Sequence, residues 1–357
     1  MGVSRPTAEE LLTVLLQQGL IREAPARQDG ERPGGRPARR YELVAERSVV
    51  AGVDIGAHKV AVALCDLNGT VLAMRRRSVD PELGAADRIE AAARLVQEAV
   101  RGSGTDQDHI RAVACGITGV LANGSTVSDV RNLPAGRDLD VYSLPGFDGI
   151  DVVAQVTDRF KRDVLIANDI QAAALAEQWK GAATRARDLV YMHAGRRLGA
   201  AILINGQIHN GRRGLAASVG SMKLLGWPEA MTALDRAALE RAGSTAAQAT
   251  GDDVQALFRA AGSGDPTAVQ VVDGVAQALA VGASTLVHAV DPDLVVIGGG
   301  LSRAGDALTL PFEWHFAATS LNSPEVRVSL LGDESVALGA ARLALDAYKE
   351  LLVTVQA

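Results

Sequence analysis

A short segment after the first strongly apolar stretch carries residues that suit phosphate and magnesium. Asp54-Ile55-Gly56-Ala57-His58-Lys59 occupies a tight turn that follows a strand. Gly56 lets the backbone approach a ligand closely. Asp54 can hold a water bound to Mg²⁺, and Lys59 can meet a phosphate group. The alternative is an ordinary β-turn with solvated Asp and Lys side chains, and this segment alone leaves both interpretations open.

A second candidate is Asn168-Asp169, where a predicted strand meets a predicted helix. A carboxylate in this position can act as a general base toward a sugar hydroxyl. The alternative is that one residue of the pair only caps the helix that begins at Ile170.

Two glycine-rich turns are further candidates for ligand contact. Gly195-Arg196-Arg197-Leu198-Gly199 can cradle phosphate through its backbone N–H groups. Its two arginines either bind an anion or fill the space that a nucleotide needs, and the alternative is a surface hairpin turn. Gly298-Gly299-Gly300 follows an apolar strand and permits close contact with a flat ligand such as adenine.

The elements that must position these segments form two similar α/β units. One β-hairpin is predicted over residues 49–74 and a second over 188–204. Further strands are predicted over 110–117, 163–167 and 294–297, and helices over 84–101, 170–180, most of 228–287, and 336–352. Because each hairpin begins an α/β unit, we interpret the pattern as a weak internal duplication. It predicts a two-lobed fold with a cleft between the lobes.

Composition restricts the class of protein. The 357 residues are 48% hydrophobic and carry a net charge of −6, so any contact with DNA must come from a local basic patch. The two cysteines, Cys65 and Cys115, cannot supply a four-cysteine zinc site. We expect a cytoplasmic protein, because the sequence has neither an uninterrupted apolar stretch of about 18 residues nor an apolar signal-peptide core near Met1.

The order of the motifs resembles the ROK family (repressors, open reading frames and kinases) over almost the whole chain. Segment 54–59 resembles its first phosphate motif, Asp-x-Gly-Gly-Thr-Lys, and 116–119 its Gly-x-Pro-Gly turn. Asn132-Leu133 resembles a step that contacts sugar, and 168–175 is similar to Asn-Asp-Ala-Asn-Ala-Ala-Ala-Leu, whose Asp is the catalytic base. Segments 205–206, 298–302 and 338–341 also follow in family order. The resemblance implies an actin-like ATPase (ribonuclease H-like) fold, with Asn132, Asn168 and Asp169 facing sugar.

Several residues depart from the family pattern. The second phosphate motif, Gly-Thr-Gly-Ile-Gly, is replaced by the segment 195–199, where Arg197 stands at the place of closest backbone approach. The sugar motif Ala-Gly-Glu-x-Gly-His is replaced by residues 216–221, with Ser218 for the Glu and Ser221 for the His. Residues 223–236 contain no Cys or His, so no structural zinc is expected. Asp169 is then a vestigial base, because a base without an oriented substrate contributes little.

The N-terminus resembles the DNA-binding part of the family's regulators. A helix predicted over residues 4–21 resembles the recognition helix of a winged helix-turn-helix, with Ser4, Arg5 and Thr7 at its start. Arginines of the next polar loop, including Arg36 and Arg39, resemble the wing. The alternative is a basic loop beside a core helix. Since the helices that support a recognition helix are missing, we expect either a start codon further upstream or a decayed domain.

We therefore predict three parts of the chain: a partial winged helix-turn-helix over 1–47, a first kinase-like lobe over 48–168 with a helix at 340–357 packing back on it, and a second lobe over 169–339. The predicted function is a transcriptional regulator with a degenerate sugar-kinase domain. Its expected partners are a sugar or sugar-phosphate effector, operator DNA, and further copies in a homodimer or homotetramer. The alternatives are an ATP-dependent sugar kinase, for which ATP and Mg²⁺ would be cofactors, and a non-enzymatic protein that binds a sugar phosphate or another anion.

Overall fold

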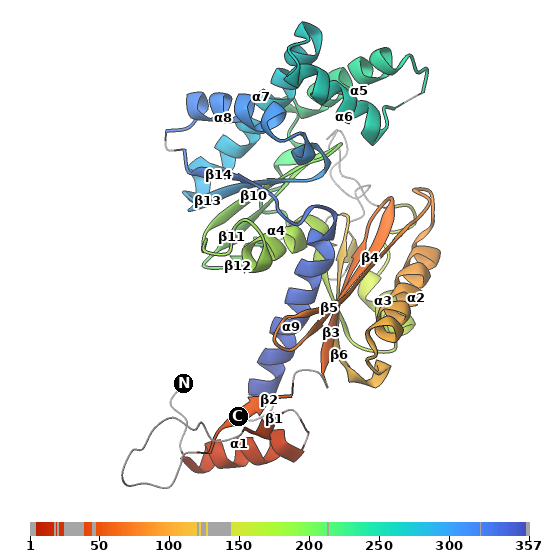
Figure 1. Cartoon of the computed structure of the whole chain (residues 1–357), viewed down its shortest axis with the longest axis vertical. Helices are drawn as coiled ribbons and strands as arrows, with labels where there is room; N and C mark the ends of the chain where they lie inside the picture. Colours follow the sequence, from red (N-terminus) through yellow and green to blue (C-terminus); the bar gives the residue numbers. More distant parts are fainter. Residues whose placement is uncertain are drawn as a thin grey trace.

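A computed structural model of the chain gives its architecture. It describes residues 5–17, 19, 21–24, 39–44, 48–119, 121–122, 126–127, 144–212, 214–246, 248–321 and 323–354. Two lobes follow one another along the long axis, and a small N-terminal unit lies at one end (Figure 1).

The first lobe is built on a five-stranded sheet in the order β5-β4-β3-β6-β9. Strands β3, β4 and β5 are antiparallel, whereas β6 and β9 run parallel to β3. Its elements are β3 (Val49–Ile55), β4 (Lys59–Asp66), β5 (Val71–Ser78), α2 (Ala85–Ser103), η2 (Gln107–His109), β6 (Ile110–Ile117), α3 (Val152–Phe160) and β9 (Val164–Asn168). The short strands β7 (Leu121–Ala122) and β8 (Thr126–Val127) pair with one another.

The second lobe repeats this topology in the order β12-β11-β10-β13-β14. Again an antiparallel hairpin precedes two parallel strands, so the duplication predicted from the two hairpins is present in the sheets. Its strands are β10 (Leu189–Ala194), β11 (Leu198–Ile204), β12 (Gln207–Ile208), β13 (Leu294–Gly298) and β14 (Glu325–Val328). Its helices are α4 (Asp169–Lys180), η4 (Val219–Ser221), η5 (Lys223–Leu225), α5 (Trp227–Ala242), α6 (Gly251–Gly262), α7 (Pro266–Val290), η6 (Gly300–Ala304), α8 (Asp306–Thr319) and η7 (Gly332–Glu334).

Strand β3 is buried along its whole length because both faces of the first sheet are covered. Val49, Ala51 and Val53 alternate onto the face covered by α2, whereas Val50 points into the cluster formed with α9 (Ser335–Thr354). A parallel strand covered on both sides is expected to be continuously apolar. Helix α9 thus follows the second lobe in sequence but packs on the sheet of the first.

Small residues allow α4 and α9 to pack closely between the two sheets. A Cβ on Gly339 would lie 1.6 Å from the carbonyl oxygen of Ala172, and one on Gly52 would lie 2.0 Å from the Ala341 nitrogen. The Leu338-Gly339-Ala340-Ala341 segment therefore has a packing role, because no larger side chain fits where the backbones approach this closely.

Helix α7 forms the centre of the second lobe. Among the described helices it alone has the length and composition to span a membrane. Polar residues interrupt it, so it has no uninterrupted apolar stretch of about 18 residues. However, 61% of that apolar window is buried. Residues of α5, α6 and α8 share its hydrophobic cluster, so α7 is a core helix.

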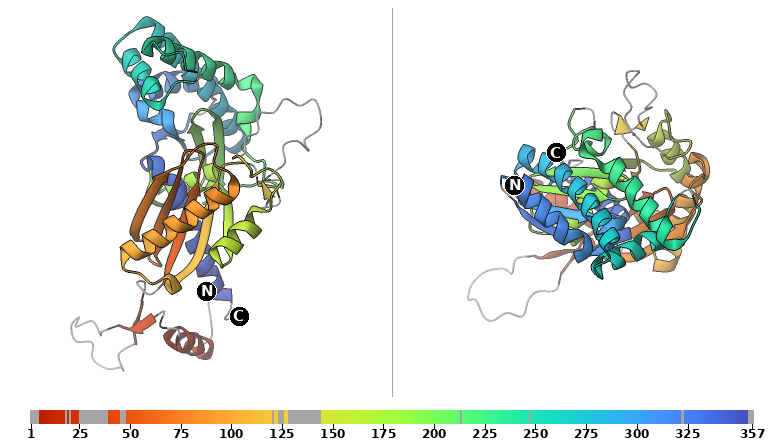
Figure 2. Two further views of the ribbon diagram at one scale, coloured as in Figure 1. Left: turned by 90° about the vertical axis from the view of Figure 1, so that its right-hand side faces the viewer. Right: turned by 90° about the horizontal axis from the view of Figure 1, so that it is seen from above.

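The N-terminal unit consists of one helix and a two-stranded ribbon. The helix predicted over residues 4–21 is α1 (Arg5–Gln17), and it ends earlier because Gly19 takes a positive φ of 67° and Ile21 enters a strand. The ribbon pairs β1 (Ile21–Glu23) with β2 (Tyr41–Leu43) in antiparallel register. Leu15 packs against the cluster around α9, and the unit lies near the C-terminal end of that helix in Figure 1 and Figure 2.

Candidate functional site

The parallel strands of the first lobe bring the predicted catalytic residues to one edge of the sheet. Ile55 of β3 pairs with Ile117 of β6, which in turn pairs with Asn168 of β9. The three strands therefore end at one level, as do the carboxyl ends of parallel strands in open α/β sheets that bind ligands. Asp54 and Asp169 lie near this edge, and the charge of Asp169 is one of the causes that raise the pKa of Asp54.

Asp54 and Lys59 form a buried ion pair across the turn between β3 and β4. Lys59 Nζ lies 2.9 Å from Asp54 Oδ2, and only 3% of Asp54 is exposed. Burial raises the pKa of the Asp54 carboxyl to about 6, and the attraction of Lys59 opposes this rise only in part. The segment is therefore not a solvated turn, and the carboxylate costs free energy to keep charged.

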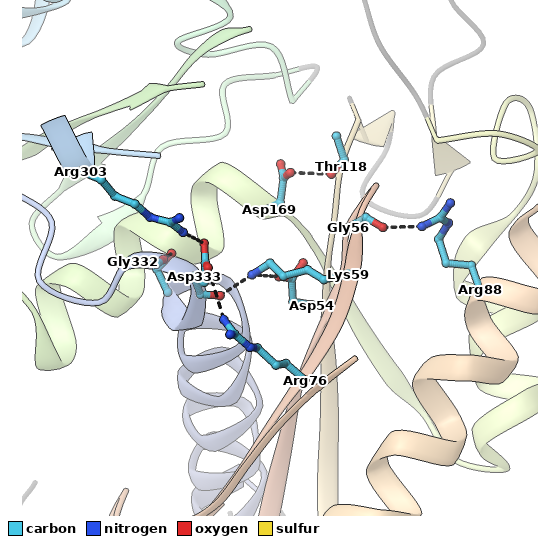
Figure 3. Close-up of polar contacts among 11 residues, drawn as sticks. Asp54, Gly56, Lys59, Arg76, Arg88, Thr118, Asp169, Arg303, Gly332 and Asp333 are labelled. Atoms are coloured by element: carbon cyan, nitrogen blue, oxygen red, sulfur yellow. Dashed lines mark hydrogen bonds and ion pairs between the residues drawn. The ribbon is translucent and has the colours of Figure 1, made fainter. Parts of the chain in front are cut away.

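Asn168 and Asp169 have separate roles. The Asn168 side chain caps α4, with Oδ1 accepting from the N–H groups of Ile170 at 2.9 Å and Gln171 at 3.3 Å. Asp169 Oδ2 instead accepts a hydrogen bond of 2.7 Å from the Thr118 hydroxyl (Figure 3). The capping alternative thus applies to Asn168, while the Asp169 carboxylate is engaged by a hydroxyl of the chain itself.

His193 adds a titratable group that the sequence analysis did not identify. It lies near the end of β10 and pairs in register with Gly298 of β13. Burial lowers the pKa of its imidazole, against the attraction of the Asp169 carboxylate, and Lys59 lowers it further. His193 thus lies within electrostatic reach of Asp169 and of Lys59.

The glycines of the two turns face the chain's own atoms. A Cβ on Gly199 would lie 2.1 Å from Ile170 Cδ1, and one on Gly298 would lie 2.1 Å from the Tyr191 hydroxyl. Gly299, at a φ of 89°, would meet the carbonyl oxygen of Ala194 at 2.4 Å, whereas Gly300 faces open space. Packing alone explains three of these four glycines. A Cβ on Gly195 would likewise lie 3.0 Å from His193 Nε2.

Arg196 pairs with partners in the second lobe. Its Nη1 lies 3.1 Å from Asp235 Oδ2 on α5, and its Nη2 donates to the carbonyl oxygen of Ala249. In this structure the partner of Arg196 is therefore an aspartate of the chain, and the binding of another anion by Arg196 stays a prediction. The Arg196 guanidinium joins the turn after β10 to Asp235 on α5 and to Ala249, which precedes α6.

The two serines at the former sugar motif lie beside β11. Ser218 precedes η4 and Ser221 ends it, and a Cβ on Gly220 between them would lie 1.6 Å from the Leu198 carbonyl oxygen. This packing places the segment against the glycine-rich turn at residues 195–199. The remaining predicted sugar contact, Asn132, lies outside the described residues.

Arg88 supports the first phosphate turn from behind, and no motif indicated it. It is fully buried on α2 and donates to the carbonyl oxygens of Gly56 at 2.6 Å and Ala57 at 2.9 Å (Figure 3). It also donates to the carbonyl oxygens of Asp80, Pro81 and Leu83 at 2.9–3.0 Å. Five hydrogen bonds from one guanidinium fix the loop, because a charged group this buried is costly unless its donors are paired.

Asp333 connects the two lobes. Its Oδ1 lies 2.5 Å from Arg303 Nη2 and its Oδ2 lies 3.4 Å from Arg76 Nη1. Its backbone carbonyl accepts a hydrogen bond from Lys59 (Figure 3). Arg303 belongs to η6, directly after the Gly298-Gly299-Gly300 turn, so this network links that turn to β4 and β5.

The predicted DNA-contacting residues fall in or near the N-terminal unit. Arg5 and Thr7 lie in the first turn of α1, while Ser4 and Arg36 lie outside the described residues. Arg39 precedes β2, and its Nε lies 4.0 Å from Glu23 Oε1 on β1. This pair lies within the ribbon and joins its two strands.

Both glycine-rich turns, 195–199 and 298–300, pack against the chain's own atoms. Backbone atoms or side chains of the chain occupy the space beside Gly199 and Gly299, and Arg196 spans the turn. Within the described part of the chain, no three His, Cys, Asp or Glu side chains gather as metal ligands. Asp54, near the end of β3, is the carboxylate of the first phosphate motif that would hold a Mg²⁺-bound water, and in this structure it pairs with Lys59.

Comparison with known proteins agrees with this architecture. The ROK family profile matches residues 50–347. A glucokinase of Halalkalibacterium halodurans is 30% identical over 50% of this chain and 62% of its own length, and a putative xylose repressor of Caldicellulosiruptor sp. is 24% identical over 97% and 90%. The solved structure of a ROK family transcriptional regulator, a homologue of the E. coli MLC protein, aligns with a TM-score of 0.71 at 18% identity, covering 99% of this chain and 91% of that one. The chain therefore belongs to the ROK family.

Proposed function

We propose that this chain is a transcriptional regulator of the ROK family, in which a sugar-kinase-like body has become a ligand-sensing module. The observation that carries this proposal is the N-terminal unit, α1 with the β1–β2 ribbon, ahead of the region that the family profile covers. The xylose-repressor relative aligns with 97% of the chain, so about 11 residues remain unmatched and most of residues 1–49 are included. A helix followed by a ribbon carrying arginine suits DNA, since a helix enters the major groove and arginines contact phosphates.

The state of the kinase residues supports a sensing role. Asp169 accepts a hydrogen bond from Thr118, Lys59 pairs with Asp54, and Arg196 pairs with Asp235. Asp169, Lys59 and Arg196 thus each already have a partner within the chain. Preorganised groups aimed at the reacting atoms are what phosphoryl transfer requires.

Helix α9 provides a physical route from this site to the N-terminal unit. It begins at Ser335, two residues after Asp333, and runs for 20 residues, about 30 Å. Near its other end, Tyr348 and Leu352 belong to the same apolar cluster as Leu15 of α1. A shift at the start of this helix would therefore reach the proposed recognition helix.

DNA binding of the full chain tests the proposal. Fluorescence anisotropy with a duplex from the region upstream of its own gene should report binding that weakens between about 50 and about 200 mM KCl. Arg39→Ala should weaken DNA binding. It should also reduce the slope of the logarithm of the binding constant against the logarithm of the salt concentration by about the amount of one phosphate contact. Arg259→Ala, on α6 at the far end of the second lobe, should change neither. The proposal fails if Arg39→Ala binds like the parent, or if even a protein extended upstream prefers no duplex.

A second candidate is an ATP-dependent sugar kinase, because Asp54 and Asp169 still meet at one edge of the sheet. The glucokinase relative is 30% identical over half of the chain. Coupled ADP-release assays across hexoses and amino sugars test it. Turnover that Asp169→Asn abolishes would establish the kinase and overturn the sensing role, whereas we expect no sugar-dependent turnover.

A further inference from the structure

Three cations from different elements converge on the segment that precedes α9. Arg303 Nη2 lies 2.5 Å from one carboxylate oxygen of Asp333, and Arg76 Nη1 lies 3.4 Å from the other. Lys59 donates to the backbone carbonyl of the same residue and lies 2.9 Å from Asp54. The chain thus supplies its own anion at a point where three positive side chains gather (Figure 3).

These cations belong to both lobes. Lys59 begins β4 and Arg76 lies on β5, both in the first sheet, while Arg303 lies in η6 of the second lobe. Asp333 sits in η7, between β14 of the second lobe and α9, which packs on the first. The Asp333 carboxylate therefore links the lobes through two exposed ion pairs, one with Arg76 of the first lobe and one with Arg303 of the second.

The occupant is replaceable on grounds of charge and exposure. Of the carboxylates paired with the three cations, Asp54 is buried and Asp333 is exposed, so Asp333 is the one that another anion can displace. The side chains of Arg76, Arg303 and Asp333 are 71%, 57% and 41% exposed, so water and solutes reach all three. Ion pairs this exposed contribute little each. A phosphate group has the geometry that arginine forks match, and it carries more charge than a carboxylate.

We propose that Lys59, Arg76 and Arg303 form a binding site for a phosphate-type dianion between the lobes, with Asp333 as its internal competitor. The incoming anion takes over the two guanidiniums and the ammonium. The Asp333 carboxylate is then released to solvent, and the segment before α9 loses its tie to both lobes. The ligand is inorganic phosphate or a phosphate monoester, since both present the same charged oxygens.

This proposal names the class of ligand that the proposed regulator would sense. It rests on the proposed function only for the expected effect of that ligand on DNA binding. Phosphate binding can be measured without DNA, ATP or turnover. A protein that binds phosphate here but not DNA would refute the regulator alone, and one that binds DNA but not phosphate would refute this site alone.

Isothermal titration of the full chain with inorganic phosphate, at constant ionic strength set by chloride, tests the site. Asp333→Asn removes the competing charge while keeping the side-chain size, and should tighten binding about five- to tenfold, because two exposed ion pairs no longer compete. Arg76→Gln and Arg303→Gln should each weaken binding about tenfold or more. Glu325→Gln is the matched control, since it breaks an exposed ion pair with Arg327 on β14 and should leave phosphate binding unchanged.

The two sources of the anion are separated by repeating the titration with glucose 6-phosphate and with glucose. Tighter binding of the ester than of phosphate identifies a sugar phosphate, and equal binding identifies the free anion; both support the site. The proposal is overturned if Asp333→Asn binds phosphate no better than the parent, or if Arg76→Gln binds it equally well. Far-UV circular dichroism checks that each variant is folded, and Arg76→Gln, at the most exposed position, keeps the test decisive if Arg303→Gln does not fold.

Discussion

Replacing Asp54 by asparagine should stabilise the protein near neutral pH, although it removes one partner of an ion pair. The carboxyl is 3% exposed, and burial raises its pKa from 3.8 to about 6 in spite of Lys59. An amide has nearly the size of a protonated carboxyl and carries no charge, so Asp54→Asn mimics the form that the buried site prefers. The rise from 3.8 to about 6 corresponds to on the order of 3 kcal/mol at neutral pH.

The sign of the pH dependence follows from proton binding. The folded protein holds the Asp54 proton more tightly than the unfolded chain does, so the parent loses stability as the pH rises from about 4 to about 6. The asparagine variant lacks this loss. The two proteins should therefore be nearly equal in stability below about pH 4, and differ by the full amount above about pH 7.

Urea unfolding followed by far-UV circular dichroism, at several values between about pH 4 and about pH 7.5, measures this difference. Glu240→Gln, at an exposed position on α5, is the control and should show no pH-dependent gain. A variant less stable than the parent at about pH 7.5, or one whose difference is the same at all pH values, would refute the reasoning. Attraction to Lys59, rather than burial, would then dominate at Asp54.

Two further substitutions test the packing around the site. Arg88→Met should lower the free energy of unfolding by about 3–5 kcal/mol, because five backbone carbonyls lose the charged donor on which they converge. Arg94→Met, which breaks an exposed ion pair on the same helix, should cost about 0.5 kcal/mol in the same chemical denaturation, and equal costs would contradict the proposed support of the turn. Gly298→Ala should destabilise by about 2 kcal/mol or more, because its Cβ would lie 2.1 Å from the Tyr191 hydroxyl, and Tyr191→Phe in the same chain should restore part of the thermal midpoint. No rescue by the double substitution would mean that the clash lies elsewhere.

The amino-acid sequence by itself determined the elements and their order. Strand β3 and the turn at Gly56 follow from local apolar runs and glycine, and two similar hairpins indicated the duplication now seen in both sheets. Motif order sufficed to select Asp54 and Asp169 as separate candidates, and the parallel strands of the structure bring them to a common edge. The end of α1 was misplaced by four residues, since helix-compatible residues after Gln17 gave way to the ribbon.

Only the tertiary structure decided which groups these residues meet. From the sequence, Arg196 could either bind an anion or fill the space that a nucleotide needs. In the structure its partner is Asp235, 39 residues away. Asp333 meets Lys59 across 274 residues, and Thr118 meets Asp169 across 51. Local periodicity fixes a helix or strand because its hydrogen bonds are local, whereas such contacts depend on sheet register and on the packing of α4 and α9. The sequence thus determined which residues are present for chemistry, and the fold determined that they are paired with one another.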